Sequence, residues 1–170
     1  MDAKVVMQLR AMTGAGVLDA QKALIEAQGN LDTAAEMLRK KGQAKAASKG
    51  DRATHEGMIG SYIHATGKVG ALVAVACETD FVARGSEFKQ LVHDLAMHVA
   101  ASNPLYLQRA DVPTEVIAKE KEIAKYYADT CLLDQPFVKD EDITVAERIR
   151  QAIAKTGENV QVKKFIRFSL

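Results

Sequence analysis

The sequence predicts an α+β fold, in which an N-terminal three-helix module precedes a core of a small antiparallel sheet covered by helices. Three observations lead to this prediction. Apolar residues recur at helical spacing in three stretches of the first forty or so residues. Two β-rich runs then follow each other across a turn, and an alternating run ends the chain, with helical patterns between them. This order of strands and helices is typical of α+β domains.

The N-terminal module is expected to contain three short helices, each with one apolar stripe. The stripes are Val5, Leu9 and Met12; Leu18, Ala23, Leu24 and Ala27; and Leu31, Ala34, Ala35 and Leu38. Residues 13–16, Gly29 and Gly42 interrupt the pattern, because glycine permits positive φ and commonly ends a helix. A unit of this size buries little apolar surface, so docking on a partner would explain its presence.

The chain divides into a docking module over residues 1–42, a linker over 43–56 and an α+β core over 57–170. The linker belongs to a basic stretch, residues 39–52, in which Asp51 is the single acid. We interpret the stretch as a mostly solvated tether that retains some helical character. The alternative is a nucleic-acid-binding patch, which the balanced charge of the chain makes the weaker interpretation.

The core begins with a hairpin. Residues 58–64 and 69–77 are β-rich and are separated by a turn at 65–68. Both faces of the second run are apolar, as expected for a central strand that is covered by helices.

Helical patterns follow the hairpin. Ser86 is expected to cap a helix that Asn103 and Pro104 end. Its predicted buried stripe is Phe88, Leu91, Val92, Leu95, Ala96 and Val99. A further helical stretch opens at Thr114. Its predicted buried seam includes Val116, Ile123 and Tyr127.

The last predicted helix and strand carry clear signals. Thr144 and Glu147 have the spacing of a capping box, which opens a helix. Gly157 is expected to end that helix. The final run alternates, which predicts a strand that joins the hairpin. Its apolar side is expected to contain Val160, Val162, Ile166 and Phe168.

Composition excludes several classes of function. The chain has 170 residues with 23 basic and 22 acidic side chains, which argues against a dedicated nucleic-acid binder. The longest apolar stretch, 69–77, is too short to span a bilayer. The two cysteines, Cys77 and Cys131, lack metal-binding or disulfide-scaffold spacing. We therefore predict a soluble, cytoplasmic protein without membrane or direct nucleic-acid contact.

No pattern indicates an enzyme, a cofactor or a bound metal. The four histidines include no pair at the helical i,i+4 spacing of a metal site. Gly67 and Lys68 lack the rest of a phosphate-binding loop. A Cys77 nucleophile with His64 as its base on the adjacent strand is conceivable, but an inert buried thiol fits the apolar strand better.

The segment over residues 79–82 holds an apolar ring at Phe81 beside the charge of Asp80, just after a strand. One interpretation is that Phe81 folds back into the core while Asp80 caps a turn. The other is that Phe81 is an aromatic anchor for a partner's pocket. Local pattern alone leaves both open.

Several blocks of sequence, spread over nearly the whole chain, resemble the bacterial elongation factor Ts family. The blocks are Leu9-Arg10-Ala11-Met12-Thr13-Gly14-Ala15-Gly16 with Asp19 and Lys22-Ala23-Leu24; Gly60-Ser61-Tyr62-Ile63-His64; Glu78-Thr79-Asp80-Phe81-Val82-Ala83-Arg84; Gln135-Pro136-Phe137-Val138-Lys139-Asp140; and Phe165-Ile166-Arg167-Phe168. Each block is weak alone, but together and in family order they are specific.

The resemblance implies a guanine nucleotide exchange factor that binds elongation factor Tu, disturbs its Mg²⁺ site and promotes release of GDP. It implies that the module of ubiquitin-associated type docks on the GTPase domain. The implied docking residues are Arg10, Thr13, Gly14, Gly16, Val17 and Leu18. The implied residues for Mg²⁺ displacement are Thr79, Asp80, Phe81 and Val82. A binding module without effect on nucleotide is the alternative.

The chain also departs from this family. Between Lys125 and Leu132 it lacks several helical turns that the family usually has, so the local fold there is not predicted. It also has a single core where longer members carry a duplicated one, so the core is expected to form a homodimer. Ile166 and Phe168 are candidates for that contact.

Overall fold

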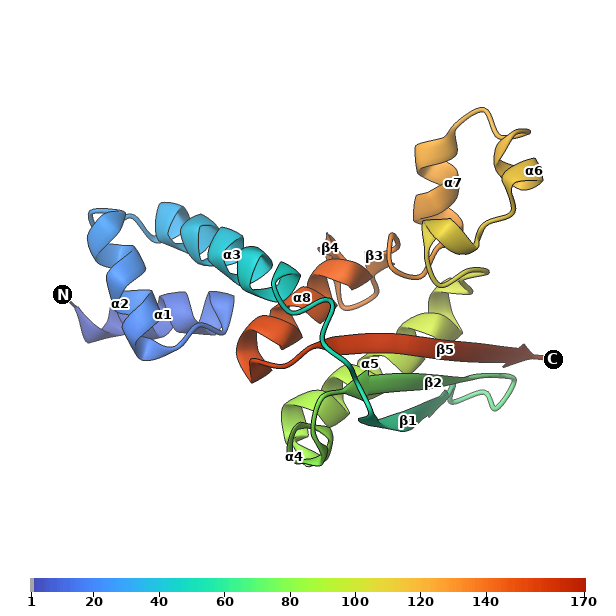
Figure 1. Ribbon diagram of the computed structural model, residues 1–170, viewed down its shortest axis with the longest axis horizontal. Coiled ribbons are helices and arrows are strands. Elements are labelled where there is room, and N and C mark those ends of the chain that lie inside the picture. Colours follow the sequence, from blue (N-terminus) through green and yellow to red (C-terminus); the bar gives the residue numbers. More distant parts are fainter. Residues whose placement is uncertain (1) are drawn as a thin grey trace.

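Helices form the N-terminal end of the computed structural model, which describes residues 2–170 (Figure 1). They are α1 (Ala3–Thr13), α2 (Val17–Glu26) and α3 (Leu31–Ala47). The Asp2 carboxylate caps α1 by accepting a hydrogen bond from the Lys4 N–H at 2.9 Å, and the Asn30 side chain caps α3 by accepting from the Thr33 N–H at 2.9 Å. The core of the module is small and rich in alanine. Its buried members are Val6, Leu9, Ala20, Ala23, Leu24, Ala27, Ala34 and Leu38.

The third helix does not end at Gly42, which corrects that prediction. Helix α3 continues to Ala47 and packs against α8 (Val145–Thr156). Gly42 lies in this contact, where an added Cβ would stand 3.5 Å from the Cβ of Ala154. Glycine alone suggested a helix end at this position. The helix continues because α8 packs against the side of α3 on which Gly42 lies. Residues 43–47 thus have the helical character expected of them, although Ala46 is buried, and the domain division at 42 stays a prediction.

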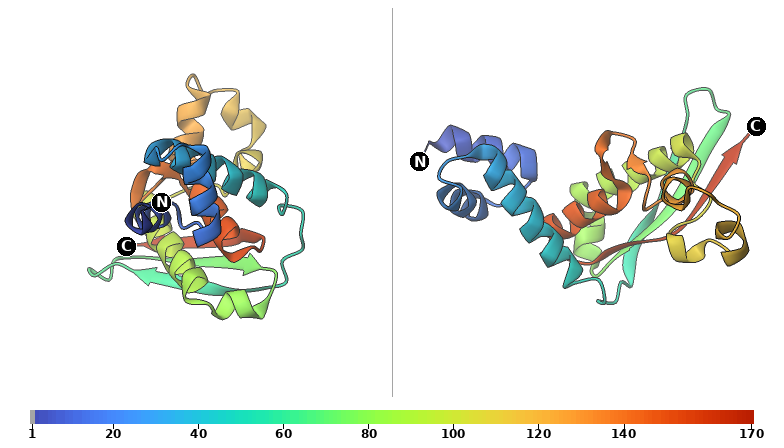
Figure 2. Two further views of the ribbon diagram at one scale, coloured as in Figure 1. Left: turned by 90° about the vertical axis from the view of Figure 1, so that its left-hand side faces the viewer. Right: turned by 90° about the horizontal axis from the view of Figure 1, so that it is seen from above.

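Polar contacts complete the junction between α3 and α8. The Glu147 carboxylate accepts hydrogen bonds from Arg39 at 3.1 Å and from Gln43 at 2.9 Å. Lys45 donates to the carbonyl of Ala154 at 3.5 Å, and Lys49 donates to that of Gly157. Basic side chains are stabilised at the C-terminus of a helix, where carbonyls are unpaired. The positive charge of the linker is thus partly used within the protein, and α3 joins the module to the core (Figure 2).

The main sheet is antiparallel, with strand order β1-β2-β5. The predicted hairpin is confirmed as β1 (Glu56–Ile63) and β2 (Val69–Cys77), with Gly60 opposite Val73. The predicted terminal strand is confirmed as β5 (Val160–Ser169), which pairs with β2. The α+β architecture is as predicted.

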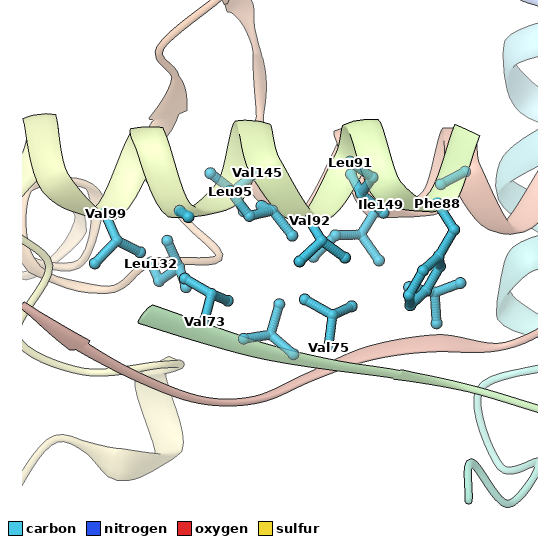
Figure 3. Close-up of a cluster of buried hydrophobic side chains, with 14 of the residues drawn as sticks. Val73, Val75, Phe88, Leu91, Val92, Leu95, Val99, Leu132, Val145 and Ile149 are labelled. Atoms are coloured by element: carbon cyan, nitrogen blue, oxygen red, sulfur yellow. The ribbon is translucent and has the colours of Figure 1, made fainter. Parts of the chain in front are cut away.

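Helices cover only one face of this sheet. Helix α5 (Ser86–Ser102) and α8 pack on the side to which Val73 and Val75 point (Figure 3). This main core includes Phe88, Leu91, Val92, Leu95, Val99, Leu132, Val145 and Ile149. On the other face Leu72 is 43% exposed. The prediction that helices cover both faces is wrong, because no helix is left to cover the second one among the described residues.

A β-bulge changes which residues of β5 face the helices. Val162 pairs with Val75 and Lys164 pairs with Ala74, so Lys163 is the extra residue. Val162 is buried against the helices, whereas Ile166 and Phe168 lie on the uncovered face and are exposed. The predicted single apolar side is therefore wrong, because one inserted residue reverses the alternation that follows it.

The helix caps agree only in part with expectation. Gly85, not Ser86, is the N-cap of α5, and Asn103 ends that helix with φ 48°. Thr144 caps α8 by accepting from the Glu147 N–H at 3.2 Å. The Glu147 carboxylate does not complete the capping box, because it binds α3 instead. Gly157 ends α8 as predicted, with φ 79°.

Residues between α5 and α8 form short elements. These are a 3₁₀ turn (Arg109–Asp111), α6 (Thr114–Ile117), α7 (Ile123–Thr130), β3 (Pro136–Phe137) and β4 (Asp140–Thr144). Neither α6 nor α7 contains a buried residue, so the seam predicted through Val116, Ile123 and Tyr127 is wrong. The segment is held by Arg109, which pairs with Asp134 at 2.6 Å, and by backbone bonds to Thr130. Two short helices cannot bury a long stripe.

Candidate partner-binding site

Helix α4 (Asp80–Arg84) follows directly after β2, at the end of the sheet where β1 begins. Thr79 is its N-cap and has extended backbone angles. The Thr79 hydroxyl oxygen accepts a hydrogen bond from the Val82 N–H at 3.4 Å. Threonine at this position satisfies a backbone donor that the helix itself leaves free, so the chain turns sharply from strand into helix.

The side chains of α4 divide into an inner and an outer set. Ala83 is buried and Val82 packs against the main core. Phe81 is 84% exposed. The interpretation that Phe81 folds back into the core is therefore wrong. An exposed aromatic ring on a helix that is anchored by its inner side chains has the character of a binding residue.

Asp80 is engaged within α4 itself. Its carboxylate lies 2.9 Å from the Arg84 guanidinium, one helical turn away, and both side chains are more than half exposed. An exposed pair of this kind contributes little to stability. Asp80 can therefore exchange Arg84 for a group on a partner at small cost.

Two carboxylates hold α4 from outside. Glu158 accepts hydrogen bonds from the Thr79 N–H at 3.0 Å and from the Thr79 hydroxyl at 2.7 Å. Glu78 accepts from the Asn159 N–H at 2.6 Å and lies 3.5 Å from Arg52. The Asn159 N–H, with Arg52, holds the pKa of Glu78 below its usual value. Glu158 is 79 positions from Thr79 and Asn159 is 81 positions from Glu78, so no local pattern in the sequence indicates these contacts.

The residues expected to dock lie in the loop between α1 and α2 and in the helix ends beside it. Gly14 has φ 67°, which favours glycine, and the Thr13 hydroxyl donates to the carbonyl of Leu9 at 2.7 Å. Arg10 donates to the carbonyl of Ala15 at 3.2 Å, so its side chain braces the loop. Gly16 has an ordinary negative φ and precedes α2 as its N-cap.

Exposed apolar side chains extend from this loop over α1 and α2. They are Met7, Met12, Val17, Leu18 and Ile25. Leu18, at 73% exposed, was predicted to belong to the buried stripe of its helix, which the structure corrects. The stripe of α2 instead uses Ala20, Ala23 and Leu24, because these face α1 and α3. Val17 and Leu18 are available to a partner.

A cleft of about 930 Å³ separates the loop from α8. Thr13, Gly14 and Gly16 line it on one side, and Arg150 and Lys155 line it on the other. The residues expected to dock lie on α1, α2 and the loop between them, whereas the residues expected to displace Mg²⁺ lie at and in α4. Helix α3 and the turn after α8 connect them.

The uncovered face of the sheet is a second apolar surface, which we call the open face. Its large members are Ile59, Ile63, Leu72, Ile166 and Phe168, each 43–72% exposed. Strand pairing brings them together, because Leu72 is opposite Ile166 and Ile63 aligns with Phe168 across Gly70. Sequence reasoning named only Ile166 and Phe168. Alternation in residues 58–64 was the available signal for Ile59 and Ile63.

The geometry excludes the Cys77–His64 pair. Cys77 is opposite Glu56, whereas His64 lies eight positions further along that strand, roughly 25 Å away. Cys77 is fully buried, its thiol donates to the carbonyl of Thr79 at 3.2 Å, and burial raises its pKa. Such a thiol is a poor nucleophile.

The remaining titratable residues form no evident centre. His98 is fully buried and lies 3.0 Å from the amide oxygen of Gln135. Over residues 2–170 no three His, Cys, Asp or Glu side chains gather closely enough to hold a metal ion. In the same range, no helix has the length and apolar character needed to cross a membrane.

Known proteins resemble this chain along nearly its whole length. A family model described as Elongation factor TS matches residues 32–125 and 122–170. Elongation factor Ts of Fervidobacterium nodosum is 46% identical over 191 residues, which cover 99% of this chain and 97% of that protein. The protein of that name from Moorella thermoacetica is 46% identical over 188 residues, covering 97% of this chain and 93% of its own. The one from Anaeromyxobacter is 47% identical over 192 residues, covering 99% and 88%.

Proposed function

Because the chain belongs to the elongation factor Ts family and is a translation elongation factor, we propose that it is the guanine nucleotide exchange factor of elongation factor Tu. In this role it binds the GDP form of that GTPase, disturbs the Mg²⁺ site and releases GDP so that GTP can rebind. It makes and breaks no covalent bond, so it is not an enzyme. It needs no cofactor, metal, membrane or nucleic acid, and it works in the cytoplasm.

Exchange of this kind is a linkage between two ligands of one GTPase. A protein that binds the nucleotide-free GTPase more tightly than its GDP form must weaken GDP binding by the same factor. A factor of about 10⁴ corresponds to about 5.5 kcal/mol of differential binding. The Mg²⁺ ion is the largest local charge near the phosphates, so displacing it applies this energy effectively.

The observation that carries the proposal is the exposed Phe81 on a capped, anchored α4. An aromatic side chain presented in this way can enter a pocket of the GTPase at small entropic cost, because the helix is already formed. When its ion pair with Arg84 is broken, Asp80 supplies a negative charge that favours the arrangement of the GTPase site without Mg²⁺. Thr79 caps the helix and Val82 anchors it.

The N-terminal module supplies affinity. Val17 and Leu18 offer exposed apolar area next to a loop that Arg10 and Thr13 stabilise. Apolar anchors beside a polar rim are typical of protein interfaces. We assign docking on the GTPase domain to this surface, with Gly14 and Gly16 shaping the loop.

The open face supports a homodimer. Two copies can place these faces together as a two-layer sheet sandwich, which would cover Ile59, Leu72 and Phe168 in both copies. A second copy fits better than a charged ligand, since the large side chains of this face are apolar. The single core then obtains the second sheet that longer members of the family carry within one chain.

Release of a fluorescent GDP from purified elongation factor Tu tests the proposal. Catalytic amounts of the full chain should accelerate release, and excess unlabelled GDP should dissociate the complex. Binding without acceleration would leave only a binding module that holds its partner without affecting nucleotide. Acceleration that Cys77→Ser leaves unchanged would agree with the buried state of that thiol.

A further inference from the structure

Glu158 engages Thr79 with both of its carboxylate oxygens. One oxygen lies 3.0 Å from the Thr79 N–H and the other lies 2.7 Å from the Thr79 hydroxyl. The hydroxyl proton is thus directed at Glu158, which leaves a lone pair on the oxygen for the Val82 N–H. Glu158 therefore determines the orientation of the residue that caps α4.

Helix α4 depends on contacts from outside. It has five residues, and a helix this short is unstable in water on its own. Its side chains Val82 and Ala83 pack against the main core. The cap at Thr79 and the carboxylate behind it fix its first turn, from which Phe81 projects.

Glu158 belongs to a turn that is itself fixed on two sides. Gly157 ends α8, and the Thr156 hydroxyl accepts from the Glu158 N–H at 3.3 Å. The next residue, Asn159, is 1% exposed and donates to the carbonyls of Gly50 at 3.1 Å and Arg52 at 2.7 Å. These carbonyls belong to the connection from α3 to β1. One turn therefore contacts α8, the connection from the docking module and the cap of α4.

We propose that Glu158 is a positioning residue for nucleotide exchange, which acts through Thr79 to hold Phe81 in the direction that enters the partner; this rests on the proposed function. The residue touches neither the GTPase nor GDP. Its contribution is to fix α4 relative to the module that docks. Small errors in the placement of an active group cost much of its effect.

The first test separates maximal rate from apparent affinity. In Glu158→Ala, the rate of GDP release at saturating concentrations should fall about tenfold. The half-saturating concentration should change little, because Val17 and Leu18 are untouched. Glu158→Gln keeps an acceptor for the Thr79 hydroxyl but not a second one for the N–H, so its rate should be intermediate. Glu122→Gln, at the residue that precedes α7, is the matched control and should exchange normally.

A double-mutant cycle tests the route through Thr79. Thr79→Ala removes the hydroxyl but keeps the backbone N–H that also binds Glu158. If Glu158 acts through this cap, adding Glu158→Ala to Thr79→Ala should therefore slow release by clearly less than Glu158→Ala does alone. Additive losses would show that Glu158 acts independently of Thr79 and would overturn the proposal. Normal maximal rates in both Glu158 variants would overturn it as well.

A readout in the free protein is independent of exchange. Amide hydrogen exchange at Thr79 and Val82 should be faster in Glu158→Ala than in the unaltered chain, while amides of β2 and α5 keep their protection. Unchanged protection at these two amides would overturn the positioning role. If the unaltered chain failed to accelerate GDP release, the proposed function would fall, and this measurement would still decide whether Glu158 positions α4.

Discussion

Individual side chains divide between those that are buried in the fold and those that are left exposed on its surface. Phe88 and Phe81 are the same residue type seven positions apart, but Phe88 is 1% exposed and Phe81 is 84% exposed. The difference arises because α5 lies over the sheet, whereas the outer side of α4 is covered by nothing within the described chain. Substitutions at these two positions should therefore have opposite consequences.

Phe81→Ala should slow GDP release by about thirtyfold or more, the size expected of an interface anchor. The unfolding midpoint in urea should stay close to that of the unaltered chain, because little buried surface is lost. Phe88→Ala is the matched control, and it should lose about 3–5 kcal/mol of stability. A large loss of stability in Phe81→Ala would contradict the exposed position of this ring.

His98 should make stability depend on pH. The Val138 N–H donates to Nδ1 at 3.1 Å, so Nε2 carries the proton and donates to Gln135 at 3.0 Å. Burial lowers the pKa of His98 from its ordinary 6.5. The unfolded chain then binds this proton at higher pH than the folded one, so stability is complete above pH 6.5 and falls as the pH drops further.

Urea unfolding at a series of pH values from 7.5 to 5.0 checks this expectation. His98→Gln should be less stable at neutral pH and should lose less stability on acidification. Carboxylates titrate in both proteins, so the difference between the two pH profiles isolates His98. Parallel profiles would show that His98 takes up its proton equally in the folded and unfolded states.

At the scale of elements, close approach decides how α5 lies on the sheet. A Cβ at Gly60 would stand 2.4 Å from Cγ1 of Val92 and 3.2 Å from its carbonyl oxygen. Glycine in β1 therefore lets the helix lie nearer than any other residue would. Glycine is thus required at position 60 by the close packing of α5, and not by the backbone angles of the residue.

Gly60→Ala should destabilise the protein by about 1–3 kcal/mol, because α5 or the Val92 side chain must shift. The neighbouring Ser61 is exposed and lies opposite Leu72 on the open face, so Ser61→Ala should change stability by less than about 0.5 kcal/mol. Urea midpoints of the two variants provide the measurement. Equal stability in both would contradict the close packing of α5 on β1.

At the scale of the whole molecule, the open face is an apolar surface of the sheet that no described helix covers. Sedimentation equilibrium of the unaltered chain should show a dimer at micromolar concentration. Phe168→Asp should shift it to the monomer, since a carboxylate would be buried without a partner. Leu105→Asp, at a 60% exposed apolar position outside this face, is the matched control. A monomeric unaltered chain would refute the homodimer.

Patterns within a few residues were predicted well. The hairpin, α8 with its cap at Thr144, and the alanine-rich helices follow from periodicity and turn chemistry. The errors arose where a distant element intervened. Gly42 suggested a helix end, but α8 covers it and α3 continues. The alternation of β5 was interpreted correctly up to Val162, after which the bulge at Lys163 reversed it.

The sequence by itself determined the α+β class and the order of the main strands and helices, and its family resemblance pointed to residues 79–82 as a candidate site. These are local signals, carried by spacing along one segment. Tertiary structure alone decided that Phe81 is exposed, that one face of the sheet stays uncovered and that Glu158 holds Thr79. Such facts depend on which surfaces meet when distant segments fold together, and no pattern within a single segment encodes that.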